Sequence, residues 1–209
     1  MVAKNGKPSI TGRISSVIPL GLFVTLIYFL PQVAAGAVLR IQLNWIPSLG
    51  VTLSLVIDGL SLLFGLIICF VGFFVSVYAA DYLPGSADRN QFFIYLHGFL
   101  LAMLGLVLAD NLLSLFVFWE LTTLISYLLI GFECESEAAR RNARQALLIT
   151  GSGGLALLIG FLLLGGIIDT YDLSRLAAQS DKIKADPLYF VVLVLVFIGS
   201  FTKSAQFPL

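Results

Sequence analysis

The chain alternates long apolar runs with short polar segments, and six of these runs are long enough to cross a bilayer. At 1.5 Å per residue, a helix needs about 20 mostly apolar residues to span roughly 30 Å of hydrocarbon. The runs are Ile14–Leu30, Val51–Ala80, Phe92–Ala109, Leu112–Phe132, Ala143–Ile168 and Leu188–Phe207. Only Asp110 and Asn111 separate the third run from the fourth, which predicts a tight hairpin between two spans.

The runs are continuously apolar rather than alternating, so the pattern predicts helices and not a barrel. Helices satisfy their own backbone hydrogen bonds in lipid. We therefore predict an all-α integral membrane protein with about six transmembrane helices. The last helix is expected to be interrupted, because Gln206 and Pro208 follow Lys203 and proline removes a backbone donor.

Composition supports a membrane protein and excludes several other classes. Hydrophobic residues make up 59% of the chain and charged residues 11%, whereas soluble domains carry roughly 25% charged residues. Twelve basic residues balance twelve acidic ones, so no nucleic-acid-binding surface is predicted. Cys69 and Cys134 lack paired or metal-like spacing. We predict no metal, no cofactor and no catalytic residue.

The distribution of lysine and arginine predicts a cytoplasmic N-terminus, because short cytoplasmic loops carry an excess of these residues. Residues 1–13 would be a cytoplasmic segment of a multi-pass protein of the cell membrane. The basic residues assigned to the cytoplasmic side are Lys4, Lys7, Arg13, Arg89, Arg140, Arg141 and Arg144. Those on the opposite side are Arg40, Arg175, Lys182 and Lys184.

Two charged residues lie inside apolar runs. Glu120 is near the middle of the fourth run, and Lys203 is deep in the sixth. A central charge costs roughly 2.5 to 3.5 kcal/mol on insertion scales, so such residues face a bundle interior and mark ion paths. A structural ion pair is the alternative, although buried pairs stabilise proteins poorly. An acid and an amine away from water suit proton transfer. Their depths differ by about 10 Å on simple counting, which leaves direct contact open.

Two further polar residues have two interpretations each. His97 lies inside the third run and is either a hydrogen-bonded packing residue or a relay, since histidines exchange protons near neutral pH. Asp58 lies inside the second run and is either a cap or loop anchor at the interface or a buried functional group.

A glycine-rich stretch in the fifth run is predicted to serve helix packing. Residues 151–154 read Gly-Ser-Gly-Gly but lack the Gly-Lys-Ser/Thr ending of a phosphate loop. Ser152, Ala156 and Gly160 form a stripe of small residues that lets a neighbouring backbone approach.

Several stretches together resemble the antiporter-type subunits of proton-translocating complexes. The resemblance is in particular to the A-type subunit of the Mrp-type multisubunit sodium/proton antiporter, with the large antiporter-like subunit of respiratory complex I as a relative. The stretches are Ile57–Phe64, Met103–Leu113, Leu115–Thr122, Ser126–Phe132 and Thr202–Pro208. From first to last, they span nearly the whole chain from the second run onward.

The resemblance implies a bundle of about fourteen helices with two inverted repeats, each containing a broken helix and a midplane lysine. Glu120 would be the glutamate of the first repeat, and Lys203 the lysine on its broken helix. Trp119, Asp58 and Pro208 would be structural or interface residues. Residues 14–109 would be N-terminal transmembrane helices and residues 110–209 the first part of the proton-conducting repeat, which makes a partial bundle from the N-terminal part of such a subunit.

The implied function is a component of a multisubunit antiporter that exchanges Na⁺ or another monovalent cation for protons, in a bilayer with other membrane subunits. Glu120 and Lys203 would transfer protons, with His97 as a possible relay. One alternative is a proton-pumping subunit of a complex I or membrane-bound hydrogenase type assembly. Another is a non-conducting fragment.

Overall fold

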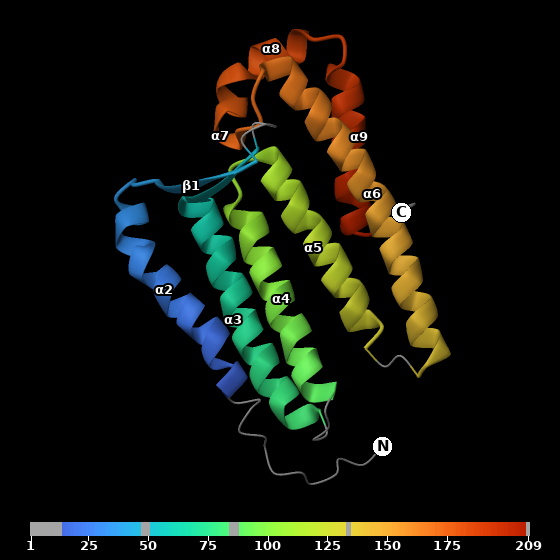
Figure 1. Cartoon of the computed structure of the whole chain (residues 1–209). Coiled ribbons are helices and arrows are strands. Elements are labelled where there is room, and N and C mark those ends of the chain that lie inside the picture. Colours follow the sequence, from blue (N-terminus) through green and yellow to red (C-terminus); the bar gives the residue numbers. More distant parts are fainter. Residues whose placement is uncertain (1–13, 47–50, 84–87, 133–134, 208–209) are drawn as a thin grey trace. The chain divides into compact units, whose positions relative to one another are not determined.

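A computed structural model describes residues 14–46, 51–83, 88–132 and 135–207, which are mostly helical (Figure 1). The elements in chain order are α2 (Val17–Ala34), β1 (Leu39–Ile46), β2 (Val51–Ile57), α3 (Gly59–Tyr82), α4 (Asp88–Leu108), α5 (Leu112–Ile130), α6 (Glu137–Ile168), α7 (Leu173–Leu176), η2 (Ala177–Gln179), α8 (Ser180–Ala185) and α9 (Tyr189–Lys203). Within the described residues, α2 to α6 are long and apolar enough to cross a membrane, and α9 is a shorter apolar helix. The predicted helical membrane architecture is confirmed.

The chain forms two compact units. Among the described residues, the first contains those up to 39 together with 56–108, and the second contains 40–55 together with those from 109 onward. Residues 40–55, which are predicted from the sequence to belong to the N-terminal range 14–109, thus cluster with the second unit.

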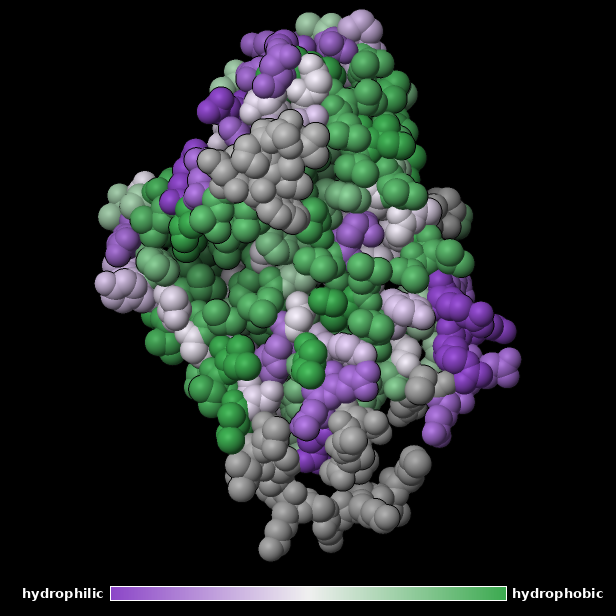
Figure 2. All heavy atoms as spheres, viewed as in Figure 1, coloured by the Kyte–Doolittle hydropathy of each residue, from purple (hydrophilic) through white to green (hydrophobic). Residues whose placement is uncertain are grey.

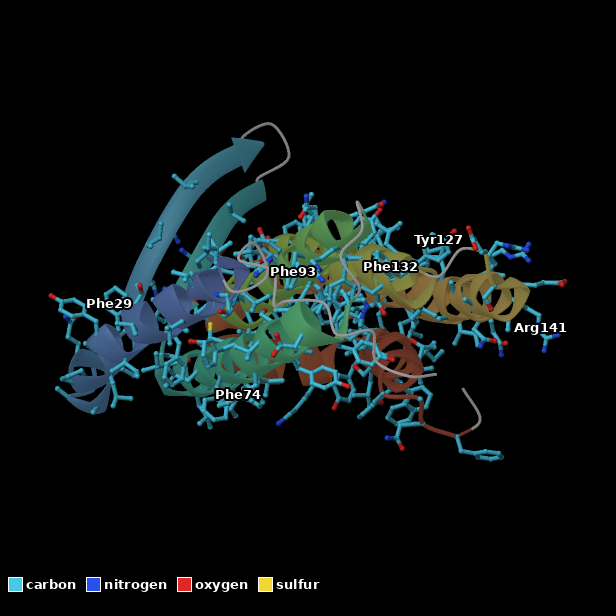
Figure 3. All side chains as sticks on the ribbon, turned by 90° about the horizontal axis from the view of Figure 1, so that it is seen from below. Phe29, Phe74, Phe93, Tyr127, Phe132 and Arg141 are labelled. Carbon is cyan, nitrogen blue, oxygen red and sulfur yellow. The ribbon has the colours of Figure 1, made fainter. Side chains whose placement is uncertain are left out.

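The first unit is a layer of three helices, with α3 packed against both α2 and α4 (Figure 1). Its main core contains Leu26, Leu62, Cys69, Leu100 and Leu104. Most other large apolar side chains in these helices are exposed, including Phe74 on the outer side of α3 (Figure 3). Such a surface suits lipid or neighbouring helices, because a long exposed apolar face is unfavourable in water.

The start of α3 differs from the prediction. Residues 51–57 were expected to begin the second transmembrane run, but they form β2, which pairs with β1 in a two-stranded sheet. The segment reads Val-Thr-Leu-Ser-Leu-Val-Ile, and its alternation of apolar and hydroxyl residues is typical of a strand. The chain is therefore mostly helical rather than all-α.

Asp58 is the N-cap of α3. Its carboxylate accepts a hydrogen bond from the Ser61 backbone N–H at 2.8 Å, and Ser61 Oγ accepts one from the Asp58 backbone N–H at 2.8 Å. This reciprocal pair is a capping box, which fixes where a helix begins. The bond from the Ser61 N–H favours the carboxylate form and lowers the pKa of Asp58.

In the second unit, α6 packs against both α5 and α9. One part of its core contains Leu112, Leu157 and Phe161, and another contains Ile167, Ile168 and Val192. The 32 residues of α6 rise about 48 Å, more than the hydrocarbon thickness. Its N-terminal turns are accordingly polar: Figure 2 shows hydrophilic residues gathered there, and Arg141 extends from this end in Figure 3.

Hydrogen bonds tie the segment after α6 to the start of α5. The backbone carbonyl of Asp110 accepts a bond from the Leu173 N–H at 2.9 Å, and its carboxylate accepts one from the Ser174 N–H at 2.9 Å. Arg40 lies 3.8 Å from the carboxylate. Asn111 caps α5 through bonds from the N–H groups of Leu113 and Ser114. These contacts set the depth of α5 relative to α6.

Candidate functional site

Glu120 lies at the middle of α5, directed at the backbone of α6. It follows Leu112 by eight residues, about 12 Å along the helix axis. The side chain is half-buried, and a Cβ built at Gly154 of α6 would overlap its Oε1 atom. Oε1 is buried, and within the described part of the chain no side chain or backbone group donates a hydrogen bond to it. The carboxylate occupies space that exists because residue 154 has no side chain.

Lys203 is the last residue of α9. Ser204 is the C-cap, Ala205 has a left-handed φ of 49°, and the Gln206 N–H donates to the Phe201 carbonyl at 3.0 Å. This is a Schellman-type helix end, in which a left-handed residue stops the helix. Pro208, predicted to contribute to the break, lies outside the described residues. The 15 residues of α9 rise about 22 Å, so a helix starting at the membrane surface would place Lys203 inside the hydrocarbon.

Three oxygen atoms of α5 surround the Lys203 amine. Nζ donates to Thr122 Oγ1 at 2.7 Å, to Thr123 Oγ1 at 2.9 Å and to the Trp119 carbonyl at 3.5 Å. Nζ also lies 5.3 Å from the centroid of the Trp119 ring, within the range of a cation–π interaction. We call Trp119 O, Thr122 Oγ1 and Thr123 Oγ1 the lysine cradle.

The hydroxyl groups of Thr122 and Thr123 already donate hydrogen bonds to the backbone of α5. Thr122 Oγ1 donates to the Trp119 carbonyl at 2.7 Å, and Thr123 Oγ1 donates to the same carbonyl at 3.2 Å. A hydroxyl has one donor and two acceptor positions. Both threonines therefore present lone pairs to Lys203, and the cradle suits a charged ammonium group.

Glu120 and Lys203 are in the same unit but do not form a direct ion pair in the described part of the chain, where Lys203 bonds to the cradle instead. The structural ion pair considered as an alternative is therefore not observed.

Glycines of α6 allow α5 and α9 to approach closely. A Cβ built at Gly153 would overlap the side chain of Thr202, which precedes Lys203, and one at Gly199 would lie 2.7 Å from the Cβ of Leu157. Gly160 faces Val196 of α9. The predicted packing role of this stretch is confirmed, but its register differs from the proposed stripe.

The stripe was expected at Ser152, Ala156 and Gly160, yet Ser152 is exposed and its hydroxyl donates to the Ile149 carbonyl of its own helix. The buried small residues between positions 151 and 160 are Gly153, Gly154 and Gly160. The seven-residue spacing of Gly153 and Gly160 was the available signal, since it corresponds to about two helical turns.

His97 belongs to the first unit, whereas the residues above belong to the second. It is buried near the middle of α4. Its Nδ1 atom is 2.7 Å from the Phe93 carbonyl and its Nε2 atom 3.0 Å from the Ser15 carbonyl. The structure thus brings Glu120 and Lys203 into one unit and bonds His97 to backbone in the other.

Thr122, Thr123 and Gly154 were not among the site residues predicted from the sequence. The signal for the threonines was weak, because single hydroxyl residues in apolar helices commonly bond to their own backbone. Within the described ranges, no group of three or more His, Cys, Asp or Glu side chains is placed to bind a metal ion.

Two families match the chain. The family described as "NADH:quinone oxidoreductase/Mrp antiporter, TM" matches residues 109–209, which include the whole site. The family described as "NADH-Ubiquinone oxidoreductase (complex I), chain 5 N-terminus" matches residues 44–93. Together they cover well over half of the chain.

Curated relatives are similar over almost the whole chain. A protein of Rhizobium meliloti, named as a subunit of a probable K(+)/H(+) antiporter, is 43% identical over 93% of this chain and 19% of its own length. A protein of Alkalihalophilus pseudofirmus, named as a subunit of a Na(+)/H(+) antiporter, is 42% identical over 95% of this chain and 25% of its own length. The chain thus spans about a fifth to a quarter of the length of these relatives.

Solved structures share the fold. The Mrp complex from Dietzia sp. DQ12-45-1b contains a chain that is 33% identical, with a TM-score of 0.84 over 95% of this chain and 22% of that one. An archaeal membrane-bound sulfane sulfur reductase contains a chain with a TM-score of 0.75 at 21% identity, which shows the fold alone. Residues 109–209 thus match the NADH:quinone oxidoreductase/Mrp antiporter family, and the chain is similar to the N-terminal part of the A-type subunit of Mrp antiporters.

Proposed function

We propose that this chain is part of a multisubunit Mrp-type antiporter that exchanges a monovalent cation for protons, and that Glu120 and Lys203 transfer protons within it. The observation that carries the proposal is an acid and an amine at membrane depth, on α5 and α9 of one unit, without a direct ion pair among the described residues. Charges inside a membrane are costly and mark ion paths. The family match and the names of the relatives support the same function.

We propose Na⁺ as the exchanged cation, other membrane subunits of the antiporter as partners, and a cytoplasmic N-terminus in a cell-membrane protein. The relative from Alkalihalophilus pseudofirmus is named for Na⁺ and the one from Rhizobium meliloti for K⁺. Exchange measured with Na⁺ and with K⁺ at equal concentration tests this choice, and faster exchange with K⁺ would contradict it.

The test of the site uses the full antiporter complex in everted membrane vesicles, with cation-driven proton movement followed by a pH-sensitive dye. Glu120→Gln and Lys203→Met remove one charge each and are expected to abolish exchange while the complex keeps its normal abundance. Matched controls are Glu135→Gln and Lys184→Met, because both side chains are exposed, and these variants should exchange normally. Full exchange by both site variants would refute the proposed role of Glu120 and Lys203.

A second candidate function is a proton-pumping subunit of a redox-driven complex. It is favoured by the match of residues 44–93 to a complex I family. Purification of the native assembly distinguishes the two, because redox subunits would copurify with a pump. Cation-dependent exchange in an assembly without redox subunits would support the antiporter.

A further inference from the structure

We infer that Thr122 and Thr123 are positioning residues that hold Lys203 through their hydroxyl oxygens, in place of a carboxylate. The inference rests on the proposed function and deepens it, because it names what keeps the amine available for proton transfer. Thr122 has no exposed surface and Thr123 is 2% exposed. Solvent therefore does not compete with Lys203 for these two oxygens within the described structure.

The direction of the two short hydrogen bonds matches the amine. A lysine ammonium has donors and no acceptor, and the hydroxyl oxygens of Thr122 and Thr123 accept two of its three N–H groups, while the Trp119 carbonyl, which already accepts from both hydroxyls, lies farther away at 3.5 Å. Both threonine hydroxyls donate their protons to the Trp119 carbonyl. Their lone pairs are therefore already oriented to accept hydrogen bonds from Lys203.

The cradle also has a physical consequence for Glu120. A bond from an ammonium to a neutral hydroxyl is already charge-assisted, but a carboxylate partner would add the attraction between opposite charges and hold the ammonium more firmly. Uncharged oxygens bind the ammonium without neutralising it. Nζ donates to the oxygens of Thr122 and Thr123, while the Glu120 carboxylate faces Gly154.

The same cradle fits the neutral amine. When Nζ gives up a proton to the proposed transfer path, the electron pair of the broken N–H bond stays on Nζ as a lone pair, and the O–H of either threonine can rotate from the Trp119 carbonyl to donate to Nζ. No atom is gained or lost in this rotation, and one hydrogen bond replaces another. Threonine hydroxyls can therefore serve both protonation states of Lys203, which an acceptor without a proton could not do.

The competing explanation is packing by the threonine methyl groups, and substitutions separate the two. Valine keeps the branched shape and removes the hydroxyl, whereas serine keeps the hydroxyl and removes the methyl. We compare Thr122→Val/Thr123→Val with Thr122→Ser/Thr123→Ser in the full complex in everted vesicles. Thr150→Val in α6 is the control, since its hydroxyl bonds to the Ala146 carbonyl one turn earlier.

The double valine variant is expected to lower the exchange rate by at least about tenfold, because a charged donor loses two acceptors. The double serine variant should stay within about threefold of the unchanged protein, less than the loss of one hydrogen bond to a charged group. Exchange by the valine variant at the unchanged rate would overturn the inference. Equal slowing by serine and valine would overturn it too, because packing would then explain the effect.

If the valine variant does not accumulate in the membrane, Thr122→Cys/Thr123→Cys replaces it. Cysteine has nearly the size of serine, but sulfur is a weak acceptor, so cysteine should be slow where serine is not. Failure of this inference remains separate from failure of the proposed function. The first leaves Glu120→Gln and Lys203→Met inactive while valine is tolerated, and the second leaves Glu120→Gln and Lys203→Met active.

Discussion

The two units of this chain each contain three packed apolar helices, but their internal polar side chains have different hydrogen-bond partners. In the first unit, both ring nitrogens of His97 face backbone carbonyls of Phe93 and Ser15. In the second, Lys203 bonds to uncharged oxygens, and Glu120 Oε1 has no donor among the described residues. The internal polar group of the first unit is thus bonded to backbone, whereas the two charged groups of the second are proposed to transfer protons.

The two units also differ in how their helices pack. The first unit has a leucine-rich core, while the second brings α6 close to α5 and α9 through Gly153, Gly154 and Gly160. Close approach at glycines places the Glu120 carboxylate against α6 and the residue before Lys203 against the same helix. The variants below test whether this difference separates a working unit from a supporting one.

Gly154→Ala should have the largest effect. The new methyl group would overlap the Glu120 carboxylate and displace it, which should lower exchange by at least about tenfold, or about 1.4 kcal/mol in the barrier. Gly151→Ala is the matched control, because nothing lies within 4 Å of a Cβ at that position. Equal exchange by the two alanine variants in vesicles would show that the space at Gly154 is not needed.

Gly153→Ala should destabilise the second unit. Its methyl group would overlap Thr202, and overpacking costs typically about 1 to 3 kcal/mol. We expect earlier thermal loss of the folded complex in detergent, measured by fluorescence-detected size exclusion after heating. Gly166→Ala on the same helix has open space around its Cβ and should melt like the unchanged protein. Melting of Gly153→Ala at that same temperature would contradict the close contact.

His97→Leu should weaken the first unit without changing how exchange depends on pH. A neutral imidazole donates one hydrogen bond, so loss of the ring removes one donor from the buried carbonyls of Phe93 and Ser15, at a cost of about 1 to 3 kcal/mol. The measurements are thermal stability and a pH profile of exchange per complex. A displaced pH profile would make His97 a relay, and the contrast between the units would fail.

Asp58→Ala should have the smallest effect, about 1 kcal/mol, which is typical for loss of an N-cap. Asp58→Asn keeps an acceptor for the Ser61 N–H and serves as the control. Because the pKa of Asp58 is lowered in the folded chain, its contribution is present above the unfolded value of about 3.8 and is lost as the pH falls through the folded value. Equal thermal stability of the alanine and asparagine variants at neutral pH would argue against the cap.

Most of the fold followed from the apolar runs, because length and hydropathy decide which segments enter a bilayer. The exception was residues 51–57, where a short alternating strand is joined to a long apolar helix and resembles part of it. The capping residues Asp58 and Ser61 mark the true start of α3. The alternation in residues 51–57 was enough to predict a strand. It was missed because these residues are nearly as apolar as the helix that follows them.

The candidate site was only partly predictable. Glu120 and Lys203 were recognisable because a charge in an apolar run is costly wherever the helix packs. Thr122, Thr123 and Gly154 were not, because threonine and glycine are tolerated in membrane helices for many reasons. The role of the threonines depends on contacts across 81 residues for Thr122 and 80 for Thr123.

The sequence by itself determined that this chain enters a membrane, which family it resembles and which two charges lie within apolar runs. Hydropathy and charge are properties of each residue, so they can be read along the chain. Only the tertiary structure decided which oxygens receive the Lys203 amine and which glycine makes space for Glu120. Hydrogen-bond partners and steric space depend on which helices pack together and in what register, and neither is a property of one helix alone.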